Sequence, residues 1–143
     1  MFAKKYEERL KSWNQFRQNL ELSDDPFGDV IEFYKPAPTV SIHTDPFNSE
    51  AWPDPWQLVL ENQYCDFTRV LGYGYSLQLT ERFSGEEFEI HICTDDMLGY
   101  MYLLFINNSE VLGYDENAVV SKQDLPTELR SQHVFTLSSQ NKY

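Results

Sequence analysis

The spacing of apolar residues changes its period about halfway along the chain, and this change constrains the fold class. In the first half, apolar positions recur every three or four residues, as on one face of an α-helix. From Tyr75 onward, apolar and polar residues alternate, as in a half-buried β-strand. Helices followed by strands predict an α+β fold, with three or four helices and an antiparallel sheet of about four strands after Tyr75.

Four segments carry helix signals. Residues 3–22 have a narrow aromatic stripe formed by Tyr6, Leu10, Trp13, Phe16 and Leu20. Asp25 and Asp54 each stand directly before a proline, the arrangement of an N-cap followed by the first helical position. They predict short helices that begin at these prolines. A fourth helix is expected to begin near Cys65, and two glycines weaken its pattern after residue 71.

The second half carries the strand signals. Residues 75–79 alternate and are a candidate first strand, although a helix that continues to Leu79 fits the same residues. Residues 88–93 predict a half-buried strand with His91 on its polar face. Residues 100–106 predict a central strand, joined to a partner at 110–114 by an Asn-Asn-Ser turn. Further elements are a short strand at 118–121, a helical turn at 126–131 and a last strand at 134–137.

A chain of 143 residues predicts one domain, which we divide into three parts. Residues 1–22 form an amphipathic helical arm. Residues 23–54 form a short helix and a proline-rich strap, in which Val40 and Ile42 alternate before the chain continues extended across another part of the molecule. Residues 55–143 form an α+β core with a C-terminal tail.

Charge divides the chain in a similar way. The 11 basic and 23 acidic residues give a net charge of −12, but residues 1–20 hold five basic and two acidic side chains. Residues 21–96 hold three basic and sixteen acidic side chains. An acidic body repels phosphate, so nucleic-acid binding is not expected, although a protein that mimics DNA would be similarly acidic. The basic arm should be attracted to an acidic surface, either on its own body or on a neighbour.

Compartment and cofactor use follow from what the sequence contains. The longest apolar run is too short for a membrane helix, and the opening residues are too charged for a signal peptide. Two cysteines, Cys65 and Cys93, fit a reduced, intracellular chain. The three histidines (His43, His91 and His133) are far apart, and Gly72-Tyr73-Gly74 lacks the third glycine of a dinucleotide-binding loop. No metal, cofactor or small-molecule substrate is therefore expected.

Large aromatic residues are the candidate protein-binding residues. Trp13, Phe16, Trp52 and Trp56 are expected to be exposed anchors for a partner, because large aromatics contribute a disproportionate share of interface energy. The alternative is that these four side chains close the core of the domain itself. Composition cannot separate the two, because both use an apolar aromatic stripe.

Cys65 is the candidate nucleophile, since a thiol at a helix N-terminus is activated by the helix dipole. After this helix come the segments Gly99-Tyr100-Met101-Tyr102-Leu103-Leu104-Phe105-Ile106-Asn107 and Val111-Leu112-Gly113-Tyr114-Asp115. This order of elements resembles the core of transglutaminase-like cysteine enzymes. The resemblance implies a triad of Cys65, Tyr100 and Asp115. The family has histidine where this chain has Tyr100, and a phenol, with an ordinary pKa of about 10, is no base near neutral pH. The resemblance therefore implies the scaffold without its chemistry, unless His91 takes the place of the missing base.

A second resemblance concerns the whole chain. Three segments carry it: Trp52-Pro53-Asp54-Pro55-Trp56-Gln57-Leu58-Val59-Leu60-Glu61-Asn62-Gln63-Tyr64-Cys65-Asp66-Phe67, then Tyr75-Ser76-Leu77-Gln78-Leu79, then Glu89-Ile90-His91-Ile92. In these segments the chain is similar to small acidic proteins of tailed phages, especially of marine cyanobacteria. This resemblance implies a virion or assembly component. Its partners would be other virion proteins or a second copy of the chain, first in the host cytoplasm and then in the particle.

These observations favour a non-enzymatic phage protein that acts by protein–protein binding in the neck, tail or baseplate. One alternative is a transglutaminase-like acyltransferase or amidase that uses Cys65. Another is an acidic inhibitor that imitates DNA. If residues 1–22 form a detachable arm, deleting them should abolish assembly and leave a folded body.

Overall fold

The computed structural model describes residues 1–41, 44–95 and 99–137. It confirms the α+β class, with the helices in the first half and a five-stranded antiparallel sheet, rather than four strands, in the second. The helices are α1 (Tyr6–Leu20), α2 (Pro26–Tyr34), α3 (Pro55–Glu61) and α4 (Asp66–Gln78), with short 3₁₀ turns η1 (Ser49–Ala51) and η2 (Lys122–Asp124). The strands are β1 (Phe88–Asp95), β2 (Gly99–Ile106), β3 (Glu110–Leu112), β4 (Val120–Ser121) and β5 (Arg130–Thr136).

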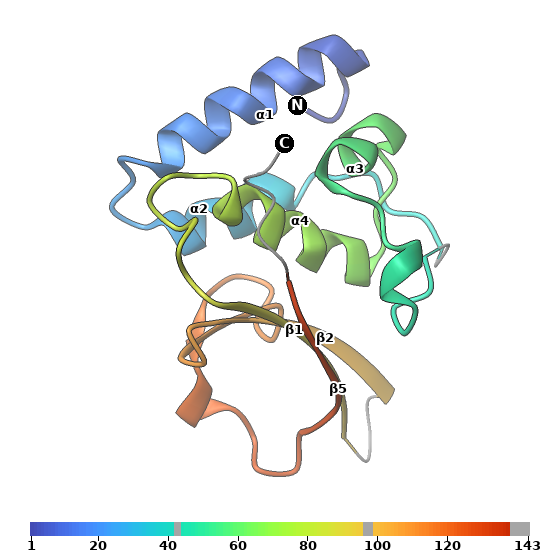
Figure 1. Cartoon of the computed structure of the whole chain (residues 1–143), viewed down its shortest axis with the longest axis vertical. Coiled ribbons are helices and arrows are strands. Elements are labelled where there is room, and N and C mark those ends of the chain that lie inside the picture. Colours follow the sequence, from blue (N-terminus) through green and yellow to red (C-terminus); the bar gives the residue numbers. More distant parts are fainter. Residues whose placement is uncertain (42–43, 96–98, 138–143) are drawn as a thin grey trace.

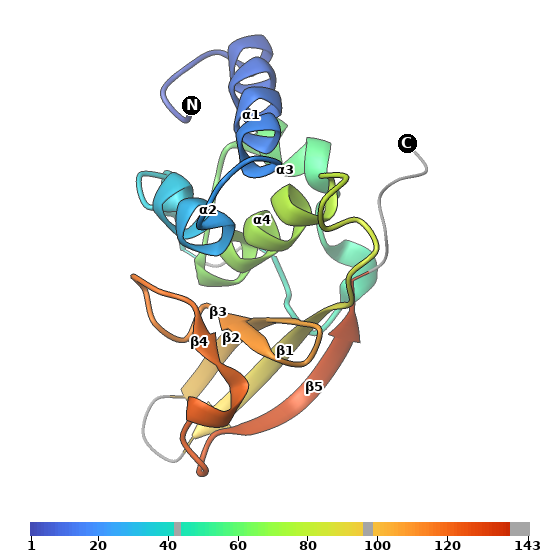
Figure 2. The same ribbon diagram turned by 90° about the vertical axis from the view of Figure 1, so that its left-hand side faces the viewer.

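The molecule has two main layers, with the four helices on one face of the sheet (Figure 1). The strands lie in the order β4-β3-β2-β1-β5, and α4 packs directly on β1 and β2. Figure 2 shows the connection from β4 to β5 on the other side of the sheet. There Leu125 and Leu129 pack against a small second core of Cys93, Leu103, Phe105 and Val111. Both faces of the central strands are therefore covered.

Local chemistry at the element ends agrees with the sequence predictions. The Asp25 side chain accepts a hydrogen bond from the Gly28 backbone N–H (3.1 Å), which caps α2. Asp54 and Gln57 form a reciprocal capping box at the start of α3, with distances of 2.8 and 2.9 Å. Asn107 and Asn108 adopt positive φ angles of 53° and 55° in the turn between β2 and β3. These starts and turns are set by side chains that act within a few residues.

Of the two alternatives for residues 75–79, the strand is wrong and the continuing helix is confirmed, because α4 extends to Gln78 with Leu79 as its C-cap. The helix is buried at nearly every position, since it lies between the other helices and the sheet. A helix without a polar face shows no 3.6-residue period in its sequence. Gly72 allows this packing: a Cβ there would lie 2.8 Å from Cε1 of Tyr34.

The N-terminal helix is part of the core, and so it is not an exposed arm. Trp13 is 1% exposed, and its indole Nε1–H donates to Ser76 Oγ on α4 (2.9 Å). Arg9 is buried as well, and its guanidinium donates to the carbonyl oxygens of Val59 (3.1 Å) and Leu60 (3.0 Å) on α3. The basic helix therefore packs on the body of its own chain.

The proline-rich strap lies across the helices and one edge of the sheet. Trp52 packs between Phe67 of α4 and Phe135 of β5, with ring-centroid distances of 5.1 and 5.0 Å. The Pro53 carbonyl oxygen accepts a hydrogen bond from the Tyr75 hydroxyl (2.7 Å). Ile42, which is part of the expected alternation, and His43 lie outside the described residues, as does the tail after residue 137.

The last part of the chain differs from its sequence prediction. The helical turn expected at 126–131 is limited to one turn, in which the Leu129 N–H donates to the Pro126 carbonyl (3.2 Å), because β5 begins at Arg130 and pairs with β1. His91 points to the face opposite the helices, as predicted, but it is only 8% exposed because the β4–β5 connection lies beside it. The sequence therefore predicted the polar face of β1 correctly, but it did not predict that the β4–β5 connection covers this face.

Candidate functional site

The four predicted aromatic anchors lie mainly inside the molecule. The expectation that Trp13 is exposed is wrong, because α1 packs it against Ser76 and the Trp56 ring (6.3 Å between centroids). Phe16 is half-buried and stacks on Phe33 at 3.8 Å with an interplanar angle of 8°. Trp52 and Trp56 are also half-buried. The structure does not bring these four together on one surface, and each joins two elements of the core.

The positions implied by the transglutaminase resemblance do not form a catalytic set among the described residues. Cys65 caps the start of α4 and is 2% exposed, with its sulfur 3.5 Å from Thr68 Oγ1. Tyr100 is 57% exposed on β2, and Asp115 accepts from the Asn117 backbone N–H (2.8 Å). His91 lies on the other face of the sheet from Cys65 and cannot replace the missing base.

Replacing Cys65 by alanine is expected to lower the free energy of unfolding by about 1 kcal/mol, because it removes one buried sulfur from a packed site. Partner binding should not change. Urea unfolding of the two proteins checks the first effect. Stoichiometric labelling by a cysteine-directed active-site probe, lost only in Cys65→Ala, would contradict this prediction, because it would reveal a reactive thiol.

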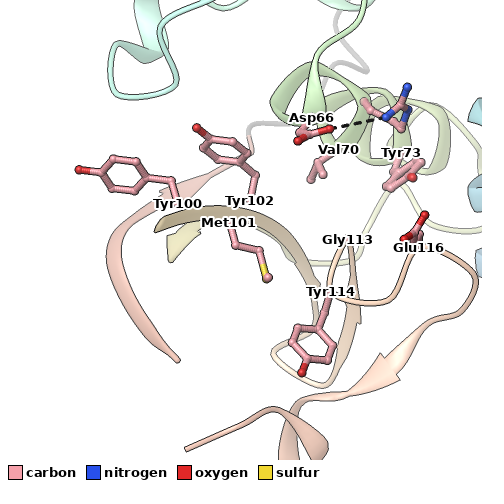
Figure 3. A pocket seen from close by; sticks show the side chains of 10 residues that line it. Asp66, Val70, Tyr73, Tyr100, Met101, Tyr102, Gly113, Tyr114 and Glu116 are labelled. Atoms are coloured by element: carbon pink, nitrogen blue, oxygen red, sulfur yellow. Dashed lines mark ion pairs between the residues drawn. The ribbon is translucent and has the colours of Figure 1, made fainter. Parts of the chain in front are cut away.

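A cleft of about 380 Å³ lies between the first half of α4 and the β2–β3 hairpin (Figure 3). We call it the tyrosine cleft, because Tyr73, Tyr100, Tyr102 and Tyr114 line it. Figure 3 shows Tyr102 near the helix, whereas Tyr100 and Tyr114 point away from it. The other lining residues are Asp66, Arg69, Val70, Met101, Gly113 and Glu116. The cleft thus combines aromatic faces, phenol hydroxyls and carboxylates.

The backbone at Gly113 shapes the floor of the tyrosine cleft. Gly113 follows β3 and has a φ angle of +102°, which L-residues with a side chain rarely adopt. A Cβ at this position would lie 2.7 Å from the Tyr102 carbonyl oxygen. The chain can therefore turn close to β2 here, and the lining residues Tyr114 and Glu116 follow this turn.

Charges in the cleft are mainly negative. Arg69 is engaged inside the protein, because its Nη2 donates to Thr39 Oγ1 (2.9 Å) and its Nη1 lies 3.8 Å from Asp66 Oδ1. The Asp66 and Glu116 side chains are exposed. Burial raises the pKa of the Tyr73 phenol, so this hydroxyl stays protonated and able to donate a hydrogen bond.

A rim of exposed aromatic residues continues from the cleft. Phe47 of the strap is 39% exposed and packs edge-on against Tyr100, with centroids 5.4 Å apart. Its other neighbour is His133 of β5, at 5.0 Å. Sequence reasoning missed this surface, because its members come from the strap, β2 and β5. The only local signal was the pair of tyrosines at positions 100 and 102.

No protein-family model, curated protein or solved structure matches the chain. None of the described helices is long and apolar enough to cross a membrane. In the same part of the chain, no group of three or more His, Cys, Asp or Glu side chains is placed to hold a metal ion.

Proposed function

We propose that the protein is a structural or assembly component of a tailed phage that acts by binding another virion protein. The binding surface in this proposal is the tyrosine cleft together with its aromatic rim of Phe47, Tyr100 and His133. The observation that carries it is the exposed aromatic surface at the cleft mouth, where Tyr100 is more than half exposed beside Phe47. The phage context rests on the sequence resemblance, and it places the chain in the host cytoplasm and then in the virion.

Aromatic residues at this position suit an interface. Tyrosine offers a large, rigid contact area with a hydroxyl that can be satisfied by a partner, and it is enriched among residues that dominate binding energy. The tryptophans are less suited, since Trp13 is buried and the half-buried rings of Trp52 and Trp56 already contact the protein's own core. The surface for a partner is therefore at the sheet end of the molecule, and not on α1.

The charge of the cleft indicates a partner with a basic surface. Asp66 and Glu116 stand beside the tyrosine rings, and the whole chain carries a net charge of −12. An arginine or lysine side chain over a tyrosine ring gains a cation–π interaction, which contributes about 0.5–1 kcal/mol at an exposed site. Nearby carboxylates add attraction and speed association at low salt. Binding should therefore weaken as ionic strength rises.

The double variant Tyr100→Ala/Tyr114→Ala is expected to lose binding by about 30-fold or more, equivalent to about 2 kcal/mol, as for interface anchors. The measurement is incorporation of the tagged chain into purified phage particles, quantified by mass spectrometry, for wild type and variant. Leu22→Ala and Leu60→Ala are matched controls, because both leucines are exposed and apolar but lie outside the cleft.

Two outcomes would contradict this proposal. The first is equal incorporation of the double variant and wild type, which would place the contact elsewhere. The second is absence of the wild-type chain from both particles and assembly intermediates. Circular dichroism of the variants separates lost binding from lost folding.

A further inference from the structure

A second cavity, of about 370 Å³, lies on the sheet face opposite the helices. Its roof is the connection from β4 to β5, which Figure 2 shows on that side of the sheet. Most of its wall is apolar, contributed by Leu103, Phe105, Leu125, Pro126 and Leu129. Polar side chains of His91, Cys93, Lys122, Thr127 and Ser131 also line it. An apolar cavity with a few convergent polar groups is the usual form of a small-molecule site.

Two side chains that line this cavity, His91 and Ser131, form a hydrogen-bonded series with Glu89, which lies outside the lining. His91 Nδ1 lies 2.8 Å from Ser131 Oγ, and His91 Nε2 lies 3.1 Å from Glu89 Oε1. An ionised carboxylate only accepts hydrogen bonds, so Glu89 places the imidazole proton on Nε2. Nδ1 is then left with its lone pair facing the serine hydroxyl. This is the order of orienting acid, base and hydroxyl found where a serine is activated as a nucleophile.

The sheet holds the hydrogen-bonded side chains of Glu89, His91 and Ser131 in place. Glu89 and His91 are alternate residues of β1, and the pairing of β1 with β5 brings Ser131 opposite Cys93 on the same face. The imidazole is stacked on Phe105 at 3.8 Å with an interplanar angle of 21°. Ser131 is exposed on the edge strand. The base is thus fixed by packing, while the hydroxyl remains within reach of a ligand in the cavity.

We propose that this cavity is an esterase site for short apolar acyl esters, with Ser131 as the nucleophile and His91 as the general base. Ser131 Oγ bonds to the ester carbonyl carbon as its proton passes to His91 Nδ1. The ester C–O bond then breaks, and the alcohol leaves with that proton. Water repeats the sequence: it gives a proton to His91 and its oxygen to the acyl carbon, and the released Ser131 oxygen recovers the proton from His91.

Other groups in and beside the cavity have defined parts in this activity. Glu89 is a positioning residue, because it acts on the substrate only through the imidazole. Lys122 also lines the cavity; its ammonium donates to Asn108 Oδ1 (2.8 Å), and its remaining N–H groups can stabilise the negative charge that develops on the carbonyl oxygen. Cys93 does not compete as the nucleophile, since it is buried and burial raises its thiol pKa. The leucine and phenylalanine walls accommodate the acyl chain.

The test uses the full chain, a fluorophosphonate probe that labels activated serines, and p-nitrophenyl butyrate as the ester. We expect stoichiometric labelling at Ser131, located by peptide mass spectrometry, and its loss in Ser131→Ala. His91→Gln should reduce kcat for the ester by about 100-fold or more, as expected for loss of a general base. Glu89→Gln should lower kcat and leave KM unchanged, which a purely structural defect of the cavity would not do.

Ser84→Ala is the matched control, since Ser84 is a half-buried serine outside this cavity whose hydroxyl donates to the Glu81 carbonyl (3.2 Å). It should label and turn over ester like wild type. The proposal is overturned if wild type is not labelled, if the probe attaches to another residue, or if His91→Gln retains full activity. Thermal unfolding of each variant identifies a loss that comes from misfolding, and labelling of Cys93→Ala excludes the thiol.

Discussion

A chain that lacks residues 1–22 is expected to be unfolded. The deletion removes the Trp13 ring from the core, and with it the hydrogen bond to Ser76. It also removes Arg9, whose bonds satisfy carbonyl groups at the end of α3. Loss of a buried tryptophan alone costs about 3–5 kcal/mol, a large part of the 5–15 kcal/mol that stabilises a typical domain. Circular dichroism and thermal melting of the truncated chain measure the effect.

Point variants separate the contribution of Trp13 from that of the whole helix. Trp13→Ala should lower the free energy of unfolding by about 3–5 kcal/mol, and Trp13→Phe by less, because the phenyl ring keeps most of the apolar contact. Leu22→Ala should change it by less than about 0.5 kcal/mol, since Leu22 is 89% exposed. A cooperative melt of the truncated chain near the wild-type temperature would mean that α1 is a detachable arm after all.

Alkaline pH is expected to unfold the protein steeply. Burial raises the pKa of the Tyr34, Tyr64 and Tyr75 phenols, whereas unfolded tyrosines ionise near pH 10. Below about pH 10 both states keep their protons, and stability does not depend on these groups. Above about pH 10 the tyrosines of the unfolded state lose protons that the folded state still holds. The free energy of unfolding therefore falls by about 1.4 kcal/mol per pH unit for each such tyrosine. The measurement is urea unfolding at a series of pH values above about 9, in steps of about half a pH unit.

Tyr64 provides the matched variant for this prediction. Its hydroxyl oxygen is buried and has no hydrogen-bond partner among the described residues, whereas the Tyr34 hydroxyl is bonded to Ser76 (2.9 Å). Tyr64→Phe should therefore keep or raise stability at neutral pH by about 1 kcal/mol, and reduce the alkaline slope by about 1.4 kcal/mol per pH unit. Tyr34→Phe should reduce the slope but lose stability at neutral pH. An unchanged slope in both variants would place the alkaline sensitivity in other groups.

Much of the secondary structure could be read from the sequence because its causes are local. Asp25 and Asp54 cap their helices through bonds that reach only three residues ahead. The asparagines at 107 and 108 tolerate the positive φ angles of their turn. The alternation in β1 reflects one face against the helices and one away from them. In each case the residue and the structure that it sets are neighbours in the chain.

The sequence alone therefore determined the class of this protein, its helix starts and its hairpin turn. For the elements with a polar face, unlike α4, it also determined which side is apolar. The tertiary structure decided what covers each apolar side. The stripe of α1 is equally apolar whether it meets its own body or a partner, and only packing against Ser76 and α3 makes Trp13 a core residue. The tyrosine cleft and the Glu89–His91–Ser131 chain likewise join residues distant in sequence. Their juxtaposition follows from strand order and register, which are set by the energy of the whole packed sheet and not by any short segment.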